Sequence, residues 1–221
     1  MQVDKFHLKK ILSKKKLKSN PWLVEKKLIK QYKNIIAIDE AGRGALAGPL
    51  ALGCLYLDKK LLEIIEKNKI IFFDSKVLKP KEREFFKKII KKLGLPHKVL
   101  LINNKKIDKM GINNAFLWGI KKLINYFNSN SVILDGKKIK GLNYYNVYFF
   151  IKGDRQLPAL GGASILAKTY RDKYMERISK KYPGYLFEIH KGYGTLQHLR
   201  LIKKLGLSEI HRRSFKISLK F

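Results

Sequence analysis

Short apolar runs alternate along the chain with longer segments in which apolar residues recur every three or four positions. The short runs, rich in Ile, Val, Leu and Phe, are typical of buried strands, and the periodic segments are typical of amphipathic helices. We expect strands over residues 34–39, 49–57, 70–73, 98–102, 131–135 and 147–151. We expect helices over residues 80–92 and 112–127, after Gly161-Gly162 to about Lys180, and up to about Leu205. Because strands and helices intermix throughout, the pattern predicts an α/β domain around one sheet.

The first part of the chain differs from the rest in being strongly basic. Asn20 before Pro21 is typical of a helix start, and apolar residues then recur at helical spacing. We therefore predict a basic helical N-terminal extension over residues 1–33 and one domain over residues 34–221, which ends in a helical region. Two interpretations of the extension stay open. It is either a solvated helix packed on the domain edge or a nucleic-acid arm in which Trp22 or Tyr32 stacks on bases.

The charge of the chain is strongly unbalanced, with 49 Lys and Arg against 17 Asp and Glu and a formal net charge of +32. Such a surface attracts polyanions, and its binding to a phosphate backbone weakens steeply as the salt concentration rises. An AT-rich coding sequence also favours Lys, which dominates here, so the composition alone leaves open whether the excess is functional. In either case we expect the surface to bind nucleic-acid backbones.

Several carboxylates stand out from this basic background because they end apolar runs. Asp39 and Glu40 end one predicted strand, and Asp135 ends another. Asp154 lies in a later loop. Active sites of open α/β sheets gather at strand ends, and carboxylates that converge there repel one another unless a cation lies between them. Mg²⁺ and Mn²⁺ favour carboxylate oxygens, so the pattern fits a two-metal phosphodiesterase. For Asp135-Gly136 alone, a turn is the commoner explanation.

Other chemistries fit the sequence less well. It contains no phosphate-binding G-x-x-x-x-G-K-[ST] loop, no G-x-S-x-G motif and no histidines at zinc-ligand spacing. The single cysteine, Cys54, lies in an apolar run and allows no intrachain disulfide, so we expect a buried packing residue and a reducing, cytoplasmic setting. The longest apolar stretch, residues 45–57, is too short for a membrane span, so we expect no membrane association.

Five blocks of residues, in this order and spacing, resemble the ribonuclease HII family of type 2 ribonucleases H. The blocks are Asp39-Glu-Ala-Gly-Arg-Gly44 with Leu46-Ala-Gly-Pro49, Asp74-Ser-Lys76, Leu134-Asp-Gly136, Lys152-Gly-Asp154 with Ala163-Ser-Ile-Leu-Ala-Lys168 and Arg171-Asp172, and His190-Lys-Gly-Tyr-Gly-Thr195 with His211-Arg212 and Ser214-Phe215. The resemblance covers residues 34–215. One block alone has little specificity, whereas five in order are highly specific.

The resemblance implies a ribonuclease H-like fold, in which a central mixed β-sheet is flanked by helices. Residues 34–221 would then be the catalytic domain, including the helical C-terminal region. The resemblance also implies a two-metal site for Mg²⁺ or Mn²⁺. Its four acids, which would be both catalytic and metal-binding, map onto Asp39, Glu40, Asp135 and Asp154.

The same resemblance implies a set of substrate-binding residues. Gly42, Arg43 and Gly44 would read the 2′-hydroxyl of a ribonucleotide and the neighbouring phosphate. Tyr193 would stack against a sugar on the DNA side of the RNA–DNA junction, and Lys76 would contact the backbone. The chemistry agrees with these roles. A 2′-hydroxyl distinguishes RNA from DNA, and glycines let backbone groups approach it closely.

The implied enzyme is a monomeric endonuclease that hydrolyses the RNA strand of RNA–DNA hybrids. It would also cut 5′ to a single ribonucleotide in duplex DNA, leaving 5′-phosphate and 3′-hydroxyl ends, and so remove misincorporated ribonucleotides and RNA primers. One alternative is the sister type, ribonuclease HIII, but the N-terminal region is too short for that type's extra domain and Asp154 stands where that type has Glu. A non-catalytic basic nucleic-acid-binding protein and an integrase-type nuclease explain fewer of the motifs.

Overall fold

A computed structural model describes residues 20–129, 131–142 and 145–218 of the chain. Five strands form one sheet in the order β3–β2–β1–β4–β5. They are β1 (Asn34–Ala41), β2 (Leu50–Asp58), β3 (His97–Ile102), β4 (Ser131–Asp135) and β5 (Asn146–Phe150). β1 and β3 run antiparallel to β2, whereas β4 runs parallel to both β1 and β5. The predicted mixed sheet is therefore confirmed.

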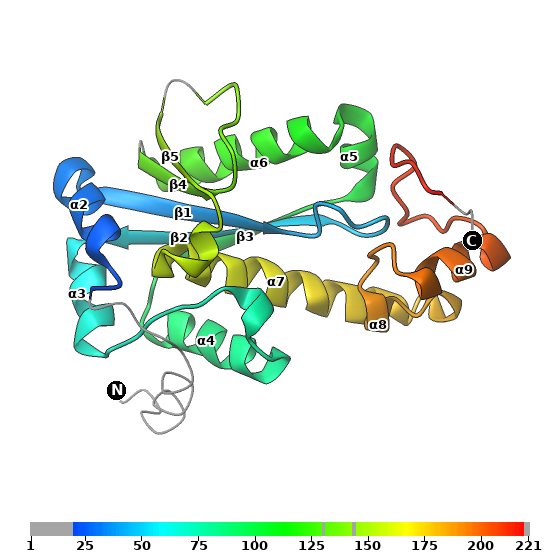
Figure 1. Ribbon diagram of the computed structural model, residues 1–221, viewed down its shortest axis with the longest axis horizontal. Coiled ribbons are helices and arrows are strands. Elements are labelled where there is room, and N and C mark those ends of the chain that lie inside the picture. The colour runs from blue at the N-terminus through cyan, green and yellow to red at the C-terminus, as the bar shows by residue number, and fades with distance from the viewer. Residues whose placement is uncertain (1–19, 130, 143–144, 219–221) are drawn as a thin grey trace.

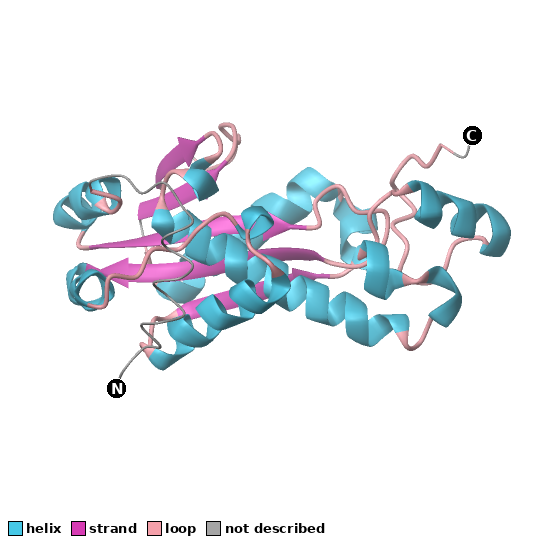
Figure 2. Cartoon of the chain, turned by 60° about the horizontal axis from the view of Figure 1, so that its bottom comes forward, coloured by secondary structure: helices cyan, strands magenta, loops and turns pink. Residues whose placement is uncertain are grey.

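Helices cover both faces of this sheet (Figure 1). One face carries α5 (Asn104–Met110) and α6 (Ile112–Phe127), and the other carries α4 (Pro80–Lys92) and α7 (Pro158–Ser179). At one end of the sheet lie α2 (Leu23–Tyr32) and α3 (Lys59–Lys67), and beyond the other end lie α8 (Phe187–His190) and α9 (Leu196–Leu205). Figure 2 shows the same layers from a second direction, with the strands between the helices. Within the described ranges, three short 3₁₀ turns complete the elements: η1 (Ser75–Val77), η2 (Gly153–Arg155) and η3 (Pro183–Tyr185).

The two faces of the sheet are buried in separate apolar clusters because successive side chains on a strand point to opposite sides. On β1, Ile35 and Ala37 belong to the cluster that includes residues of α4 and α7. Ile36 and Ile38 belong to the cluster that includes residues of α5 and α6. This alternation also fixes the direction of the carboxylates that follow on the same strand.

α7 approaches the sheet closely at one point, where β2 carries Gly53. A Cβ atom added there would lie 2.2 Å from the carbonyl oxygen of Ala163 and 2.7 Å from the nitrogen of Ala167. Only glycine leaves room for the helix backbone at this distance. Gly53 is paired with Asp39 across the two strands, so the close contact brings α7 over the functional end of β1.

The prediction of a strand over residues 70–73 is wrong. The segment is irregular, although Ile70 and Phe72 are buried in the α4–α7 cluster. A short apolar run is compatible with any buried conformation, and periodicity cannot distinguish them. The start of the long helix is also corrected, because α7 begins at Pro158 and contains both glycines. A Cβ atom on Gly161 would lie 2.8 Å from the carbonyl oxygen of Phe72, so the irregular segment packs directly on this helix.

The N-terminal helix is firmly packed where it is described. Trp22 is 2% exposed and donates a hydrogen bond from Nε1 to the carbonyl oxygen of Ile70 at 3.3 Å, so it is not available to stack on bases. The hydroxyl of Tyr32 lies 2.7 Å from that of Tyr148. Residues 1–19 lie outside the described residues, and the division of the chain at residue 33 stays a prediction. Cys54 is buried as expected. Across the described ranges, no helix is long and apolar enough to cross a bilayer.

Candidate active site

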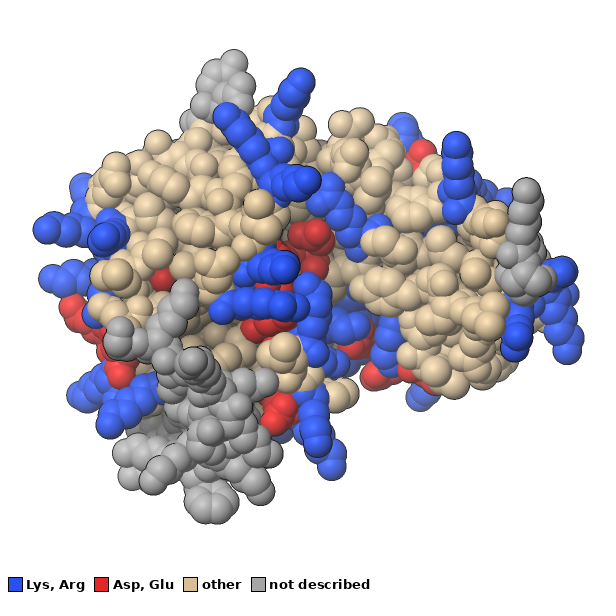
Figure 3. Space-filling view, in the orientation of Figure 1, with Lys and Arg blue, Asp and Glu red and all other residues tan. Residues whose placement is uncertain are grey.

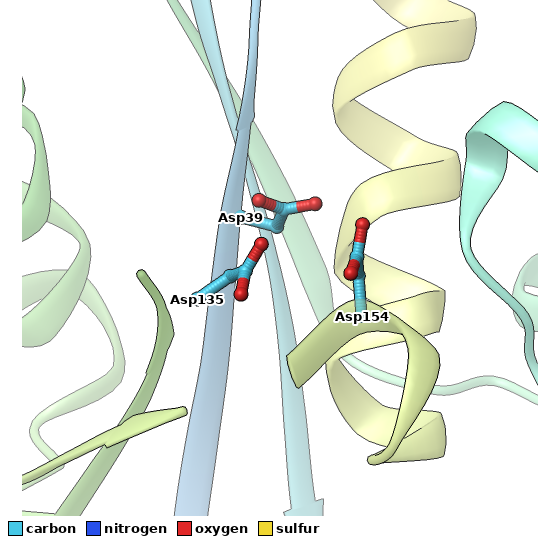
Figure 4. A group of neighbouring side chains, drawn as sticks. All are labelled: Asp39, Asp135 and Asp154. Carbon is cyan, nitrogen blue, oxygen red and sulfur yellow. The ribbon is translucent and has the colours of Figure 1, made fainter. Parts of the chain in front are cut away.

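Three carboxylates converge at the ends of β1, β4 and η2. β1 and β4 are parallel and pair Ile38 with Leu134, so the next residue on each strand, Asp39 and Asp135, points to the same α7 face. Asp154 reaches this place from η2, immediately before α7. Figure 4 shows the three side chains together, and one carboxylate oxygen from each lies within 4.8 Å of the other two.

Glu40 does not belong to this group. As the next residue on β1 it points toward the α6 face, and its carboxylate lies 3.6 Å from Nη1 of Arg43. Burial raises the pKa of Glu40, and the charge of Arg43 opposes that rise. The negative charge of Asp135 raises this pKa further, so Glu40 still feels the cluster electrostatically. The structure thus brings together three of the four predicted acids and places the fourth on the opposite side of β1.

Burial raises the pKa of Asp39 well above its ordinary value, and the charges of Glu40 and Asp135 raise it further. A hydrogen bond from the hydroxyl of Ser164 and one from the main-chain N–H of Glu40, at 2.8 Å, oppose this rise. Three mutually repelling carboxylates with oxygen-only donors suit a hard divalent cation, which would remove the repulsion. The residues present therefore fit Mg²⁺ or Mn²⁺.

The hydroxyl and amide groups around the cluster fix the directions of its carboxylates. Ser164 on α7, which bonds Asp39, lies with its Oγ 2.8 Å from that of Ser75. Oδ1 of Asp135 accepts a hydrogen bond from the main-chain N–H of Gly153 at 2.7 Å. The close approach of α7 is therefore what lets its side chains support the acid on β1.

The Asp-Ser-Lys turn at η1 supports the third acid. Nζ of Lys76 lies 3.3 Å from Oδ2 of Asp154, although the Lys76 side chain is 71% exposed. Asp74 is buried and accepts hydrogen bonds from the main-chain N–H of Lys76 at 2.8 Å and from Nε of Arg155 at 3.2 Å. Sequence reasoning assigned no role to Asp74, and an acid inside a matched block of a basic chain was the available signal.

The Gly-Arg-Gly loop follows β1 and meets the C-terminal region. The main-chain N–H of Gly42 donates to the hydroxyl of Tyr193 at 3.1 Å, so two predicted substrate-binding residues are brought together. The guanidinium of Arg43 donates to Oδ1 of Asn113 at 2.9 Å and lies 4.6 Å from the ring centre of Phe116. Gly44 has open space around its Cβ position. Its backbone is therefore accessible to a ligand.

Two buried arginines, Arg171 and Arg212, hold this loop by donating hydrogen bonds to its carbonyl oxygens. Arg212 donates to the carbonyl oxygens of Gly42, Arg43 and Gly48 at 2.7, 2.9 and 3.0 Å. Burial, followed by the charge of Arg171, lowers the pKa of Arg212 to about 9. Arg171 donates in the same way to the carbonyl oxygens of two loop residues, Ala47 at 3.2 Å and Pro49 at 2.9 Å. The sequence placed both arginines in matched blocks, but their carbonyl partners lie more than a hundred residues away.

Three histidines, His190, His198 and His211, are buried in the same C-terminal region. Burial lowers the pKa of His198 and of His211 to about 4, from an ordinary value of 6.5. Repulsion from a protonated His190 would act on both in the same direction, and the positive charge of Arg213 acts on His211. The folded protein therefore favours the neutral rings. Their contribution to stability is complete above the unfolded pKa of about 6.5 and is lost as the pH falls toward 4.

We expect the ring resonances of His198 and His211 to titrate with midpoints near pH 4 in an NMR titration of the folded protein. We also expect urea unfolding to show lower stability at pH 5 than at pH 7, because at pH 5 the unfolded chain takes up protons that the folded chain refuses. Midpoints near 6.5 would show that the rings are hydrated and would contradict the buried arrangement.

The surface over the carboxylates has the charge distribution of a phosphate-binding face. Figure 3 shows acidic atoms within a hollow near the middle of this face, with Lys and Arg side chains around it. Basic side chains at the rim attract a nucleic-acid backbone, whereas the acids at the floor repel it unless a cation screens them. The face therefore carries basic side chains at its rim and acidic ones at its floor.

A mixed sheet of this order, with carboxylates at the ends of parallel neighbours and helices on both faces, defines the class of ribonuclease H-like nucleases. The ribonuclease H2 from Pyrococcus horikoshii OT3 aligns over 83% of this chain and 94% of its own, with a TM-score of 0.64 and 26% identity. The Bst ribonuclease HIII solved in complex with Mn²⁺ aligns over 82% of this chain and 67% of its own, with a TM-score of 0.60 and 19% identity. The expected ribonuclease H-like fold is thus confirmed.

The sequence narrows the class to one family. The profile of the ribonuclease HII family matches residues 36–218. The ribonuclease HII of Caldicellulosiruptor bescii is 44% identical over 200 residues, which cover 89% of this chain and 93% of that protein. The chain belongs to the ribonuclease HII family and is a ribonuclease H, a hydrolase. The alternative of a non-catalytic binding protein is therefore set aside.

Proposed function

We propose that this protein is a metal-dependent endonuclease that hydrolyses the RNA strand of RNA–DNA hybrids and cuts 5′ to single ribonucleotides in duplex DNA. The products would carry 5′-phosphate and 3′-hydroxyl ends. The observation that carries this proposal is the convergence of one carboxylate oxygen each from Asp39, Asp135 and Asp154 within 4.8 Å. Asp39 lies three residues before Gly42, so the cluster lies close to the Gly42 loop. The removal of misincorporated ribonucleotides and RNA primers by a monomer in the cytoplasm is the matching role in the cell.

The proposed metal ligands are Asp39, Asp135 and Asp154, with Glu40 as a fourth acid whose carboxylate would have to leave Arg43 to reach the ions. When bound, two Mg²⁺ or Mn²⁺ ions would activate water and stabilise the departing 3′ oxygen. The Mn²⁺ named with the Bst ribonuclease HIII, which shares the fold, supports the choice of metal. Ser164 and the main-chain N–H of Gly153 hold Asp39 and Asp135 in fixed directions, which lowers the reorganisation needed during the reaction.

The proposed substrate contacts come from the loop after β1 and from the C-terminal region. Gly44, whose surroundings are open, would present its backbone to the 2′-hydroxyl together with Gly42, and Arg43 would contact the neighbouring phosphate. Tyr193, which already contacts Gly42, would stack against the sugar on the DNA side. The exposed Lys76 would contact the backbone beside Asp154.

Cleavage of a labelled DNA duplex that contains one ribonucleotide tests the proposal. We expect a single cut on the 5′ side of the ribonucleotide with Mg²⁺ or Mn²⁺, none with EDTA, and none in an all-DNA duplex. The reason is that the chemistry needs the cations while the loop needs the 2′-hydroxyl. If the protein cuts only a long RNA–DNA hybrid, it does not recognise the junction and has the specificity of the ribonuclease HIII type. Cleavage that persists in EDTA would exclude the proposed metal site.

A further inference from the structure

The dipeptide Gly192-Tyr193 is held at each end by a histidine ring. The main-chain N–H of Gly192 donates to Nδ1 of His190 at 3.1 Å. The carbonyl oxygen of Tyr193 lies 2.9 Å from Nδ1 of His198. A carbonyl oxygen only accepts, so His198 must carry its proton on Nδ1. The two rings also stack on each other, with centres 4.1 Å apart and an angle of 17° between their planes.

The remaining ring nitrogens complete one consistent pattern of donors and acceptors. Nε2 of His190 lies 2.7 Å from the carbonyl oxygen of Tyr185, so it carries the proton and leaves Nδ1 free to accept. Nε2 of His198 has no proton and accepts from Nε2 of His211 at 3.1 Å. Nδ1 of His211 then accepts from the main-chain N–H of Ser208 at 2.9 Å. Every ring is neutral in this pattern, because an added proton on His198 would face the N–H of His211.

The same segment is bonded directly to the loop after β1. The carbonyl oxygen of Gly192 accepts from the main-chain N–H groups of Leu46 and Ala47 at 2.8 and 3.2 Å. Ala45 forms a bridge with Tyr193. The hydroxyl of Tyr193 accepts from Gly42. The placement of the tyrosine therefore depends on the position of the dipeptide Gly192-Tyr193, and a histidine ring holds each end of that dipeptide.

We propose that His190 and His198 are positioning residues for Tyr193, and that His211 fixes the tautomer of His198. They contact neither the carboxylate cluster nor the proposed substrate, and they act by holding the N–H of Gly192 and the carbonyl oxygen of Tyr193 so that the tyrosine meets the Gly42 loop. This inference rests on the proposed recognition of the RNA–DNA junction by Tyr193. It extends that proposal by assigning the geometry of the recognition site to a neutral histidine network.

Matched Asn and Gln substitutions at each histidine distinguish the hydrogen bond made by Nδ1 from the one made by Nε2. The amide of asparagine reaches the place of Nδ1, and that of glutamine reaches the place of Nε2. His198→Asn keeps the donor to Tyr193, whereas His198→Gln loses it and keeps the contact with His211. In the same way, His190→Asn keeps the acceptor for Gly192 and His190→Gln loses it.

The readout is the ratio of kcat/KM for a duplex with one ribonucleotide to kcat/KM for a uniform RNA–DNA hybrid. We expect each Gln variant to lower this ratio by about tenfold, the effect of one lost buried hydrogen bond, and each Asn variant to leave it within about twofold of the wild type. The main-chain N–H of Gly42 donates a hydrogen bond to the hydroxyl of Tyr193. Hydrogen exchange at this amide should therefore accelerate in the Gln variants only. Thermal unfolding of all four variants shows whether each is folded at the assay temperature, so that a change in the ratio or in the exchange rate is not mistaken for loss of folded protein.

The outcomes are distinguishable. A wild-type protein that does not cut at a single ribonucleotide overturns the proposed function, and the exchange of the Gly42 amide then tests the positioning role alone. If the wild type cuts and the Gln and Asn variants share one ratio and one exchange rate, the histidines are only structural and the inference is wrong. If His198→Gln does not fold, the comparison of His190→Asn with His190→Gln answers the same question, because His190 holds the N–H of Gly192 at the other end of the dipeptide.

Discussion

Asp39→Asn should abolish cleavage while leaving duplex binding intact or tighter. The carboxylate is one of the three in the acid cluster, and an amide offers a divalent cation only one weaker oxygen. We expect the single-turnover rate to fall on the order of 10³-fold, which corresponds to about 4 kcal/mol of barrier. Binding to a labelled duplex should persist because the basic rim is unchanged and one repelling charge is gone. Gel-based cleavage and fluorescence anisotropy measure the two effects separately.

The same substitution should stabilise the metal-free protein. Burial and neighbouring carboxylates raise the pKa of Asp39, so the ionised side chain is unfavourable in the folded state at neutral pH. The neutral amide removes that penalty, and we expect Tm in EDTA to rise by about 2–4 °C, the shift that ~1 kcal/mol produces in a domain of this size. Glu63→Gln, which neutralises an exposed acid on α3, is the control and should change neither activity nor Tm. An active Asp39→Asn enzyme would remove Asp39 from the site.

Much of the sheet could be predicted because its strands are short, apolar and bounded by turn residues. The same reasoning wrongly predicted a strand over residues 70–73, an apolar run that packs against Gly161 of α7 without pairing with a strand of the sheet. Sequence periodicity reports burial, whereas a strand also requires a hydrogen-bonding neighbour. The short helices α3, α5 and α8 were not expected, since few turns give little periodicity to detect.

The acid cluster was accessible to sequence reasoning because strand ends in parallel neighbours meet at one edge of a sheet. The separation of Glu40 from Asp39 was not anticipated, although the alternation of strand side chains requires it once both lie on β1. The arginine contacts that hold the loop beside the site could not be predicted from the sequence, for a different reason. Arg212 bonds carbonyl groups about 170 positions earlier in the chain, and no local pattern encodes such a contact.

The distant contacts of the loop after β1 leave little room for a side chain at its first glycine. Gly42 has a φ of +83°, in the left-handed region that other residues rarely adopt. Its Cα faces the guanidinium of Arg171, and a Cβ atom there would lie 1.9 Å from Nε. Arg171 is fully buried and already bonded to the carbonyl oxygen of Pro49, so it has no free space into which to move.

Gly42→Ala should therefore lower the free energy of unfolding by about 3 kcal/mol, which combines left-handed strain with overpacking. In a domain of this size the corresponding fall in Tm is about 10 °C. Gly44→Ala makes the same chemical change two residues later, where φ is not positive and nothing lies within 4 Å of the new atom, so its Tm should match the wild type. Differential scanning calorimetry of the two variants compares them directly. Equal Tm values would mean that Arg171 does not pack against Gly42, and that the loop is not held from behind by the buried arginines.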